Sequence, residues 1–253
     1  MAIKESTHWY DQEGLPAYTV IGKNGKERPT TLRDARQMDL VPSVTTIIRV
    51  AAAPGLENWK IDQALLSALT LPKNEEESLD NFMRRAKRDA KEQAIQAAAK
   101  GTQIHANIEA GFESGVETDS YLAVRDTLNE LFPSNNWVAE DSFCSPLGYG
   151  GKIDLYSEQG VFVDFKTKEN IEGKDPSKLV YDEHGMQLSA YAQGMEVNSP
   201  ERVSVFIDRN NPKIVLAHVW DRDTHNKHLE MFRSLLNYWM LSKNYFPAYE
   251  MAA

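Results

Sequence analysis

Cysteine is nearly absent from this chain of 253 residues, in which Cys144 is the single example. One cysteine cannot form a disulfide within the chain, a cysteine zinc site or a cluster held by four thiolates. These supports are therefore excluded, and a hydrophobic core has to stabilise the fold. A chain of this length is sufficient for one domain with a substantial core.

The chain also lacks a long apolar run. No stretch approaches the ~18 apolar residues of a membrane-spanning helix, and the opening residues, Met1 to Ser6, contain no apolar signal-peptide core. Hydrophobic residues make up 42% of the chain and charged residues 26%, which is typical of soluble globular proteins. We therefore expect a cytoplasmic protein that does not contact a membrane.

Two neighbouring segments, 149–157 and 161–167, carry the clearest functional pattern, because charged residues recur in them at strand spacing. Side chains alternate across a strand, so residues two apart share a face. In the second segment the expected faces are Val161, Val163 and Phe165 on one side and Phe162, Asp164 and Lys166 on the other. In the first segment they are Ile153 and Leu155 against Lys152, Asp154 and Tyr156. Charge at matched positions of core strands indicates a functional role.

The loop between these segments decides whether Asp154 and Asp164 meet. A three-residue loop, Glu158 to Gly160, ends in the glycine that a type I turn with a bulge requires in the left-handed region. This loop pairs Ser157 with Val161 and, counting back, Asp154 with Asp164. Directly opposed residues have Cβ atoms ~4.5–5.5 Å apart, so the carboxylates repel each other unless a cation lies between them.

Paired carboxylates beside a lysine are suited to metal-assisted phosphodiester hydrolysis. The pattern predicts Asp154 and Asp164 as ligands of Mg²⁺ or Mn²⁺, with the backbone carbonyl of Phe165 as a further ligand. Lys166 would orient the attacking water and offset the negative charge on the phosphoryl oxygens. The alternative is a surface hairpin whose Asp–Lys ion pair has no catalytic role and contributes little to stability.

These residues fit a known set of motifs. The strand Gly151–Asp154 followed by Asp164–Lys166 resembles the Gly-x-x-Asp and Asp-x-Lys motifs of the PD-(D/E)XK nuclease superfamily. Gln187–Tyr191 is similar to the Gln-xxx-Tyr helix motif of its RecB-like branch, and Gly101–His105 to that branch's upstream histidine helix. Pro42–Thr46 resembles a segment near the start of phage-type and mitochondrial-maintenance exonucleases. The resemblance runs from roughly residue 40 to 220.

The resemblance implies a role for each matched position. His105, Asp154 and Asp164 would be metal ligands, Lys166 the catalytic lysine, and Gln187 and Tyr191 catalytic-site residues or DNA contacts. Positions 187 and 191 are i and i+4 on a helix, so they share a face. Further nucleic-acid contacts are expected at Ser43, Thr102, Lys152, Thr167 and Lys168.

Several of these positions keep a second interpretation. A lone histidine such as His105 is often a hydrogen-bonded core or surface residue. Glu109, one turn later, is either a partner of the imidazole or a solvated helix residue. Ser43 is typical of a helix N-cap, and the free N–H groups at such an end also suit a phosphate. Glu140, on the strand before the hairpin, is a further site candidate, because relatives in this branch often carry a glutamate there.

The resemblance implies a divalent-metal-dependent DNA exonuclease acting in phage-type DNA replication, recombination or degradation. Its substrate would be DNA, its partner a single-strand-annealing or replication protein, and its location the host cytoplasm if a phage encodes it. A restriction-type endonuclease of the same fold and a non-catalytic DNA-binding protein are the alternatives. Cys144 alone cannot supply the four cysteines with which some members of this branch hold an iron–sulfur cluster.

Negative charge exceeds positive charge, with 37 Asp and Glu against 28 Lys and Arg and a net charge of −9. A nucleic-acid binder of this composition needs a local basic surface. Basic residues gather at Arg84, Arg85, Lys87, Arg88 and Lys91 and, around the hairpin, at Lys152, Lys166, Lys168 and Lys174. The first of these clusters is also what a solvated helix face would show.

The fold class that we expect is α/β, a restriction-endonuclease-like αβββαβ core with a mixed central sheet and a helical N-terminal portion. Periodicity and turn signals predict a hairpin at 17–31, helices from Ser43 and at 56–69, 74–111, 119–132, 183–197 and 223–243, and strands at 136–144, 149–157, 161–167, 202–208 and 213–220. The polar segment 168–182 is expected to order when DNA binds. One domain spans 1–253, with an N-terminal part (1–75), a catalytic core (76–220) and a C-terminal helix (221–253).

Overall fold

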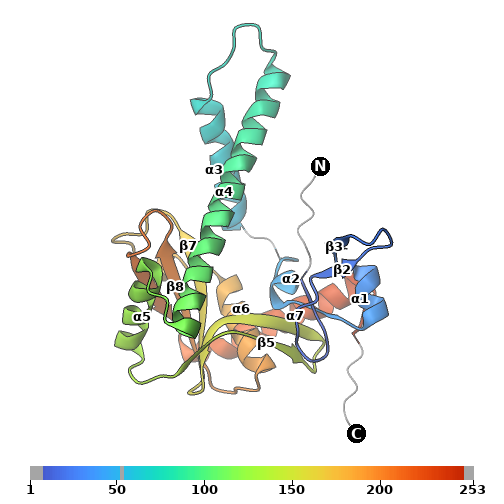
Figure 1. Ribbon diagram of the computed structural model, residues 1–253, viewed down its shortest axis with the longest axis vertical. Coiled ribbons are helices and arrows are strands. Elements are labelled where there is room, and N and C mark those ends of the chain that lie inside the picture. Colours follow the sequence, from blue (N-terminus) through green and yellow to red (C-terminus); the bar gives the residue numbers. More distant parts are fainter. Residues whose placement is uncertain (1–7, 52–53, 248–253) are drawn as a thin grey trace.

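The computed structural model describes residues 8–51 and 54–247 and is organised around a five-stranded sheet (Figure 1). The strands lie in the order β5 (Trp137–Ser145), β6 (Tyr149–Ser157), β7 (Val161–Lys168), β8 (Glu201–Asp208) and β9 (Val215–Val219). β7 and β8 run parallel, whereas the other neighbours run antiparallel. The sheet is therefore mixed, as the sequence predicts.

Helices cover both faces of this sheet. The parallel step from β7 to β8 needs a crossover, and α6 (Asp182–Gly194) supplies it. α6 and α7 (His225–Lys243) pack on one face, and α4 (Leu79–Ser114) and α5 (Asp119–Leu131) pack on the other. The sheet is thus the middle layer of a mixed α/β fold.

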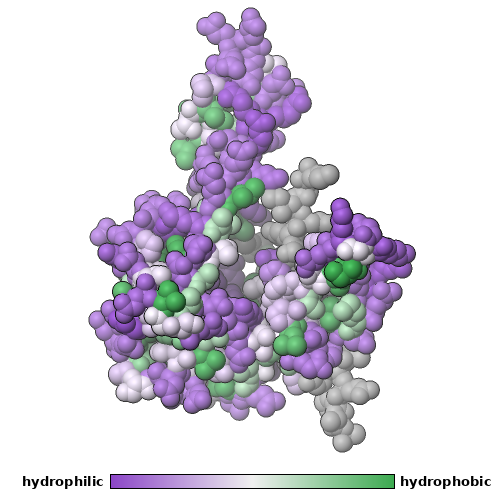
Figure 2. Space-filling view, viewed as in Figure 1, coloured by the Kyte–Doolittle hydropathy of each residue, from purple (hydrophilic) through white to green (hydrophobic). Residues whose placement is uncertain are grey.

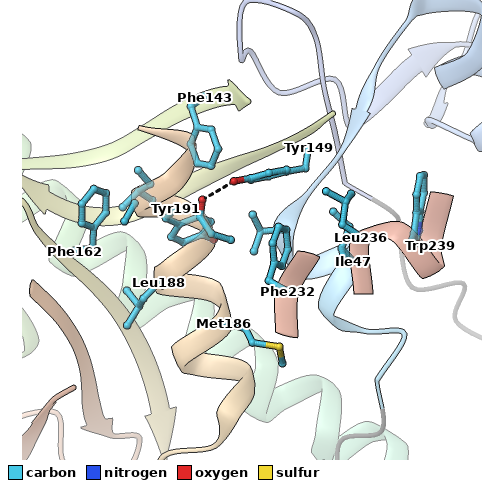
Figure 3. Packing of buried hydrophobic residues seen from close by; sticks show 14 of the residues in the cluster. Ile47, Phe143, Tyr149, Phe162, Met186, Leu188, Tyr191, Phe232, Leu236 and Trp239 are labelled. Carbon is cyan, nitrogen blue, oxygen red and sulfur yellow. Dashed lines mark hydrogen bonds between the residues drawn. The ribbon is translucent and has the colours of Figure 1, made fainter. Parts of the chain in front are cut away.

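The core on the α6 face extends past the sheet to the N-terminal segment. Leu188 of α6, Phe232 of α7 and Ile47 lie in one buried cluster (Figure 3). Within it, the Tyr149 hydroxyl donates a hydrogen bond of 3.0 Å to the Ala190 carbonyl. This bond ties β6 to the helix that carries Gln187 and Tyr191.

The core on the opposite face joins α4 to the strands of the predicted hairpin. Ile104 and Ile108 of α4 are buried in one cluster with Leu155 of β6 and Val163 of β7. These apolar contacts position the C-terminal half of α4, and with it His105, over the point where β6 meets β7.

The N-terminal segment attaches to the side of β6. Its elements are β1 (Trp9–Tyr10), β2 (Thr19–Ile21), β3 (Glu27–Pro29), α1 (Leu32–Met38), β4 (Val41–Pro42) and α2 (Val44–Ile48). β2 and β3 form the predicted hairpin, with Gly25 at a φ of 72°. Ser43 Oγ accepts from the Thr46 N–H over 3.0 Å and caps α2, and a bridge joins Ser43 to Gly150.

A helical hairpin projects from this body (Figure 1). It consists of α3 (Pro54–Thr70) and the N-terminal half of α4, a helix of 36 residues; at about 1.5 Å per residue, α4 is ~54 Å long. Leu65 and Leu69 of α3 are 56% and 83% exposed. The apolar spacing of 56–69 therefore predicted the helix correctly, but part of that apolar face points to solvent. The boundary expected at 75/76 falls within this hairpin.

The segment 168–182 is folded against the sheet, and a change in its order on DNA binding stays a prediction. Ile171 and Leu179 are buried with Phe206 of β8, and η1 (Pro176–Lys178) lies between them. The Ile171 N–H donates to Asp208 Oδ2 over 2.9 Å. Ile171 and Leu179 thus attach this otherwise polar segment to β8 through apolar packing, and the Asp208 carboxylate adds a hydrogen bond.

The remaining predicted elements are present with shifted ends, whereas β1, β4 and α1 are too short to be recognised from the pattern. Across the two described ranges, no helix combines the length and apolarity that crossing a membrane would take.

Candidate functional site

The turn between β6 and β7 sets the register that the sequence predicts. Gly160 has a φ of 85°, and its N–H donates to the Ser157 carbonyl over 2.9 Å. The ladder pairs Leu155 with Val163 and Tyr156 with Phe162. The next position in this register is Asp154 opposite Asp164, so the predicted register is confirmed.

β6 and β7 separate where the two aspartates lie. The ladder between the strands ends beside Asp154 and Asp164. Asp154 Oδ2 takes the place of a strand partner by accepting a hydrogen bond of 2.8 Å from the Phe165 backbone N–H. The separation leaves both carboxylates at the end of a paired region rather than within it.

Strand alternation is interrupted at the same place, which the sequence does not predict. Leu155 belongs to the cluster under α4, but Ile153 belongs to the cluster under α6. On β5 the same change occurs between Ala139 and Phe143, and Glu140 between them has a φ of 57°. The expectation that Ile153 and Leu155 share a face is wrong, because the paired strands turn over at this left-handed residue.

His105 faces Asp154 from α4. Its Nδ1 lies 3.8 Å from Asp154 Oδ2. Its ring meets the ring of Phe165 edge-on, with centroids 5.9 Å apart. The helix from the upstream motif thus reaches the strand break, and the structure brings the predicted His105 and Asp154 side chains together.

Gln187 links the two charged groups of β7. Its Nε2 donates to Asp164 Oδ1 over 2.8 Å and to the Tyr191 hydroxyl over 2.9 Å. Its Oε1 accepts from Lys166 Nζ over 3.3 Å. One amide side chain therefore fixes the orientation of Asp164 and holds Lys166 nearby, while Tyr191 supports the amide from the next helical turn.

Burial controls the electrostatics of Asp164. Its side chain is 1% exposed, and it forms an ion pair with the Lys166 ammonium. Burial raises the pKa of Asp164; the charge of Lys166 opposes that shift, and the charge of Asp154 adds to it. Burial also holds the pKa of Tyr191 well above its usual value, so the phenol keeps its proton at neutral pH.

Glycines in two of the motifs permit close packing at the site. A Cβ added to Gly151 would lie 2.7 Å from the Tyr191 ring, and one added to Gly101 would lie 2.8 Å from Thr167 Oγ1. The first glycine lets Tyr191 lie against β6, and the second lets α4 approach β7. Both motif glycines therefore have a steric reason in this fold.

The expected DNA contacts occupy different environments. Ser43 is 3% exposed, with its hydroxyl inside the α2 cap rather than at the surface. Thr102 is exposed, and its hydroxyl donates to the Ala98 carbonyl over 3.1 Å. Thr167 and Lys152 are half-buried.

Lys168 supports the 168–182 segment. Its Nζ donates to the Leu179 carbonyl over 3.0 Å and lies 4.8 Å from the centroid of the Tyr181 ring. Burial lowers the pKa of Lys168. The structure thus gives Lys168 an anchoring contact that sequence reasoning did not assign.

His184 is a neighbour of the site that the sequence analysis missed. It is buried on α6, and its Nδ1 accepts from the Tyr181 N–H over 3.4 Å. Burial, together with the positive charges of Lys166 and Lys168, lowers the pKa of His184 to about 2. His184 lies one helical turn before Gln187, and this spacing could have identified it. Because most of α6 is buried, however, the apolar pattern of the helix does not single out His184.

The donor atoms where β6 and β7 separate are of the chemical types that a hard divalent cation binds. They are carboxylates on two strands and an imidazole on a helix, and the buried Asp164 Oδ2 has the Lys166 ammonium as its ion-pair partner. In the part of the chain that the structure describes, no group of three His, Cys, Asp or Glu side chains is yet arranged to hold a metal. Instead, His105 faces Asp154, and Lys166 occupies the approach to Asp164.

No family model matches this chain, and no curated protein matches it either. Among solved structures, the chain is similar to the crystal structure of SSO0001, with 16% identity, a TM-score of 0.32, and coverage of 72% of this chain and 86% of that one. It is also similar to an alkaline exonuclease, LHK-Exo, from Laribacter hongkongensis. That match has 12% identity, a TM-score of 0.33, and coverage of 74% of this chain and 98% of that one.

Proposed function

We propose that this chain is a divalent-metal-dependent deoxyribonuclease, built on a PD-(D/E)XK-type core, that hydrolyses DNA from its ends. The observation that carries the proposal is the unit of Asp164, Gln187 and Lys166, which lies next to Asp154 where β6 and β7 separate. A surface hairpin with an ordinary Asp–Lys pair would not need a buried carboxylate held by a helix amide.

Lys166 is the cation best placed for the reaction. Its side chain is 28% exposed, so solvent and substrate can reach the ammonium. The same ammonium donates a hydrogen bond to Gln187 Oε1, which fixes its position. The ammonium would orient the attacking water and offset the charge that develops on the phosphoryl oxygens. Tyr191 keeps Gln187 in place and, being protonated, adds no negative charge to the site.

Asp154, Asp164, His105 and the Phe165 carbonyl are the groups that would hold Mg²⁺ or Mn²⁺. A cation bound there would supply Lewis-acid polarisation of the scissile phosphate. The Lys166 ammonium, which is paired with Asp164, is partly exposed and could also contact the substrate.

The proposal of attack from DNA ends rests on the motif resemblance. Single- and double-stranded oligonucleotides labelled at the 5′ or 3′ end, incubated with Mg²⁺ or Mn²⁺, should be shortened progressively, and EDTA should stop the reaction. Rapid cutting of a covalently closed circle would favour the restriction-type endonuclease instead. DNA binding without cleavage in either metal would favour the non-catalytic DNA-binding protein.

Replacement of Lys166 tests the catalytic assignment. Lys166→Ala should reduce cleavage to background while the dissociation constant for DNA rises by no more than about tenfold, as expected when one phosphate contact among several is lost. Lys243→Ala, an exposed lysine in the last turn of α7, is the matched control and should cleave as the wild type does. Residual cleavage within about tenfold of wild type in Lys166→Ala would contradict the role of this lysine.

A further inference from the structure

Glu140 has an unusual backbone for its place in the sheet. Its φ of 57° lies in the left-handed region, although it stands within β5, whose other residues are extended. Residues with a Cβ rarely adopt this region, and they remain there only where the surroundings hold them, often at functional sites. The flanking pairs are Ala139 with Leu155 and Asp141 with Ile153, so Glu140 stands opposite Asp154.

This backbone brings the Glu140 carboxylate to Lys152. The two side chains form an ion pair, with 17% and 37% of their surfaces exposed. Lys152 lies two residues before Asp154 on β6. Acidic residues therefore occupy matched positions on three adjacent strands, at Glu140, Asp154 and Asp164, and the two outer ones are each paired with a lysine, Lys152 or Lys166.

We infer that Glu140 is a positioning residue that holds Lys152 beside Asp154, where the ammonium binds a substrate phosphate next to the one that is cleaved. The inference rests on the proposed function and adds a phosphate subsite to it. A polyanionic substrate has to approach an acidic row, so each ammonium along that row offsets repulsion. A free lysine loses rotamer freedom on binding, and a preformed pair removes much of that cost.

Variants of Glu140 separate its charge from its backbone. Glu140→Gln removes the charge that holds Lys152 and keeps the left-handed backbone. Glu140→Gly removes the pair and relieves the backbone, because glycine adopts positive φ readily. Glu196→Gly is the matched control, since Glu196 also has a left-handed φ, of 59°, and is exposed just after α6.

The test measures binding of a labelled oligonucleotide by fluorescence anisotropy in EDTA, together with the thermal midpoint of each variant. Both Glu140 variants should raise the dissociation constant about five- to tenfold, as expected when one phosphate is no longer bound. Lys152→Ala should bind as weakly as the double variant Lys152→Ala/Glu140→Gln. The thermal midpoint of Glu140→Gly should not fall below that of the wild type. Under cleavage conditions, KM should rise in both Glu140 variants while kcat is retained.

Two results would overturn the inference. An unchanged dissociation constant in Glu140→Gly, with a raised thermal midpoint as in Glu196→Gly, would leave Glu140 as a structural residue alone. Tighter binding by Glu140→Gln would mean that the carboxylate acts by repelling DNA. Absence of DNA cleavage by the wild type in Mg²⁺ or Mn²⁺ would instead contradict the proposed function itself, and the two failures are therefore distinguishable.

Discussion

Gln187 shows why an amide suits its position. A carboxamide donates and accepts at once, and here it donates to Asp164 and accepts from Lys166. A glutamate could not donate to Asp164, and it would place a further negative charge beside a buried carboxylate. The spacing of Gln187 and Tyr191 is visible in the sequence, but the partner of each atom depends on the tertiary structure.

Asp208, at the end of β8, makes a pH-dependent contribution to stability. Its Oδ2 accepts from the Ile171 N–H over 2.9 Å and its Oδ1 from the Asn210 N–H over 2.8 Å. Burial alone would raise the pKa of Asp208, but hydrogen bonds from the backbone favour the charged form and leave its pKa below the usual 3.8. A lowered pKa stabilises the fold above pH 3.8, and that stability is lost as the pH falls through the pKa of the folded state.

Asp208→Asn should therefore lower the free energy of unfolding by ~1–3 kcal/mol at pH 7, because one acceptor becomes a donor that faces an N–H group. The difference from the wild type should shrink below about pH 4. Urea unfolding at both pH values measures it, with Asp126→Asn, whose side chain is 62% exposed, as the control. A difference that stays constant across this pH range would contradict the assignment.

At the scale of elements, periodicity was sufficient to predict the helices and strands of the core and the register of β6 against β7. It could not predict the change of face at Asp154. That change depends on the left-handed φ of Glu140, and glutamate is not a residue type that signals positive φ. Apolar spacing also could not show that Leu65 and Leu69 face solvent, because it reports a helix and not its neighbours.

The approach of α6 to β6 yields a prediction at this scale. In Gly151→Ala the new Cβ would meet the Tyr191 ring at 2.7 Å, so the ring has to move and its hydrogen bond with Gln187 is disturbed. We expect a loss of ~1–3 kcal/mol in stability and, at a temperature where the variant is folded, a fall in kcat of about tenfold or more.

Gly150→Ala is the control for this prediction. Its new Cβ would meet the Phe143 carbonyl oxygen at 2.8 Å instead of Tyr191. Circular dichroism melts and initial cleavage rates should show similar destabilisation in the two variants but a slower reaction only in Gly151→Ala. Equal kcat values for both variants would contradict a role of Tyr191 packing in the site.

At the scale of the whole molecule, a protein with a net charge of −9 would bind DNA, as proposed, only through local basic surfaces. The projecting hairpin offers one, since Arg84, Arg85 and Arg88 line a groove with Glu77 and Asn81. Figure 2 shows a largely hydrophilic surface on this hairpin. α4 continues from this groove to His105 in the site, so the hairpin and the site share one rigid element.

Charge reversal tests whether this surface binds DNA or is only a solvated helix face. The double variant Arg88→Glu/Lys91→Glu should weaken DNA binding and reduce the slope of log K against log salt by about one for each phosphate that the protein no longer neutralises. Lys243→Glu, at the end of α7, should leave that slope unchanged. An unchanged slope in the double variant would favour the solvated face.

The proposed function depends on the binding of one divalent cation by Asp154 and Asp164 where β6 and β7 separate. A crystal structure with Mn²⁺, using the anomalous signal of manganese, measures this directly. We predict a peak in contact with an oxygen of each carboxylate at ~2.0–2.2 Å, with Lys166 displaced from Asp164. Saturating Mn²⁺ with no peak at that position, and with Lys166 still paired to Asp164, would contradict it.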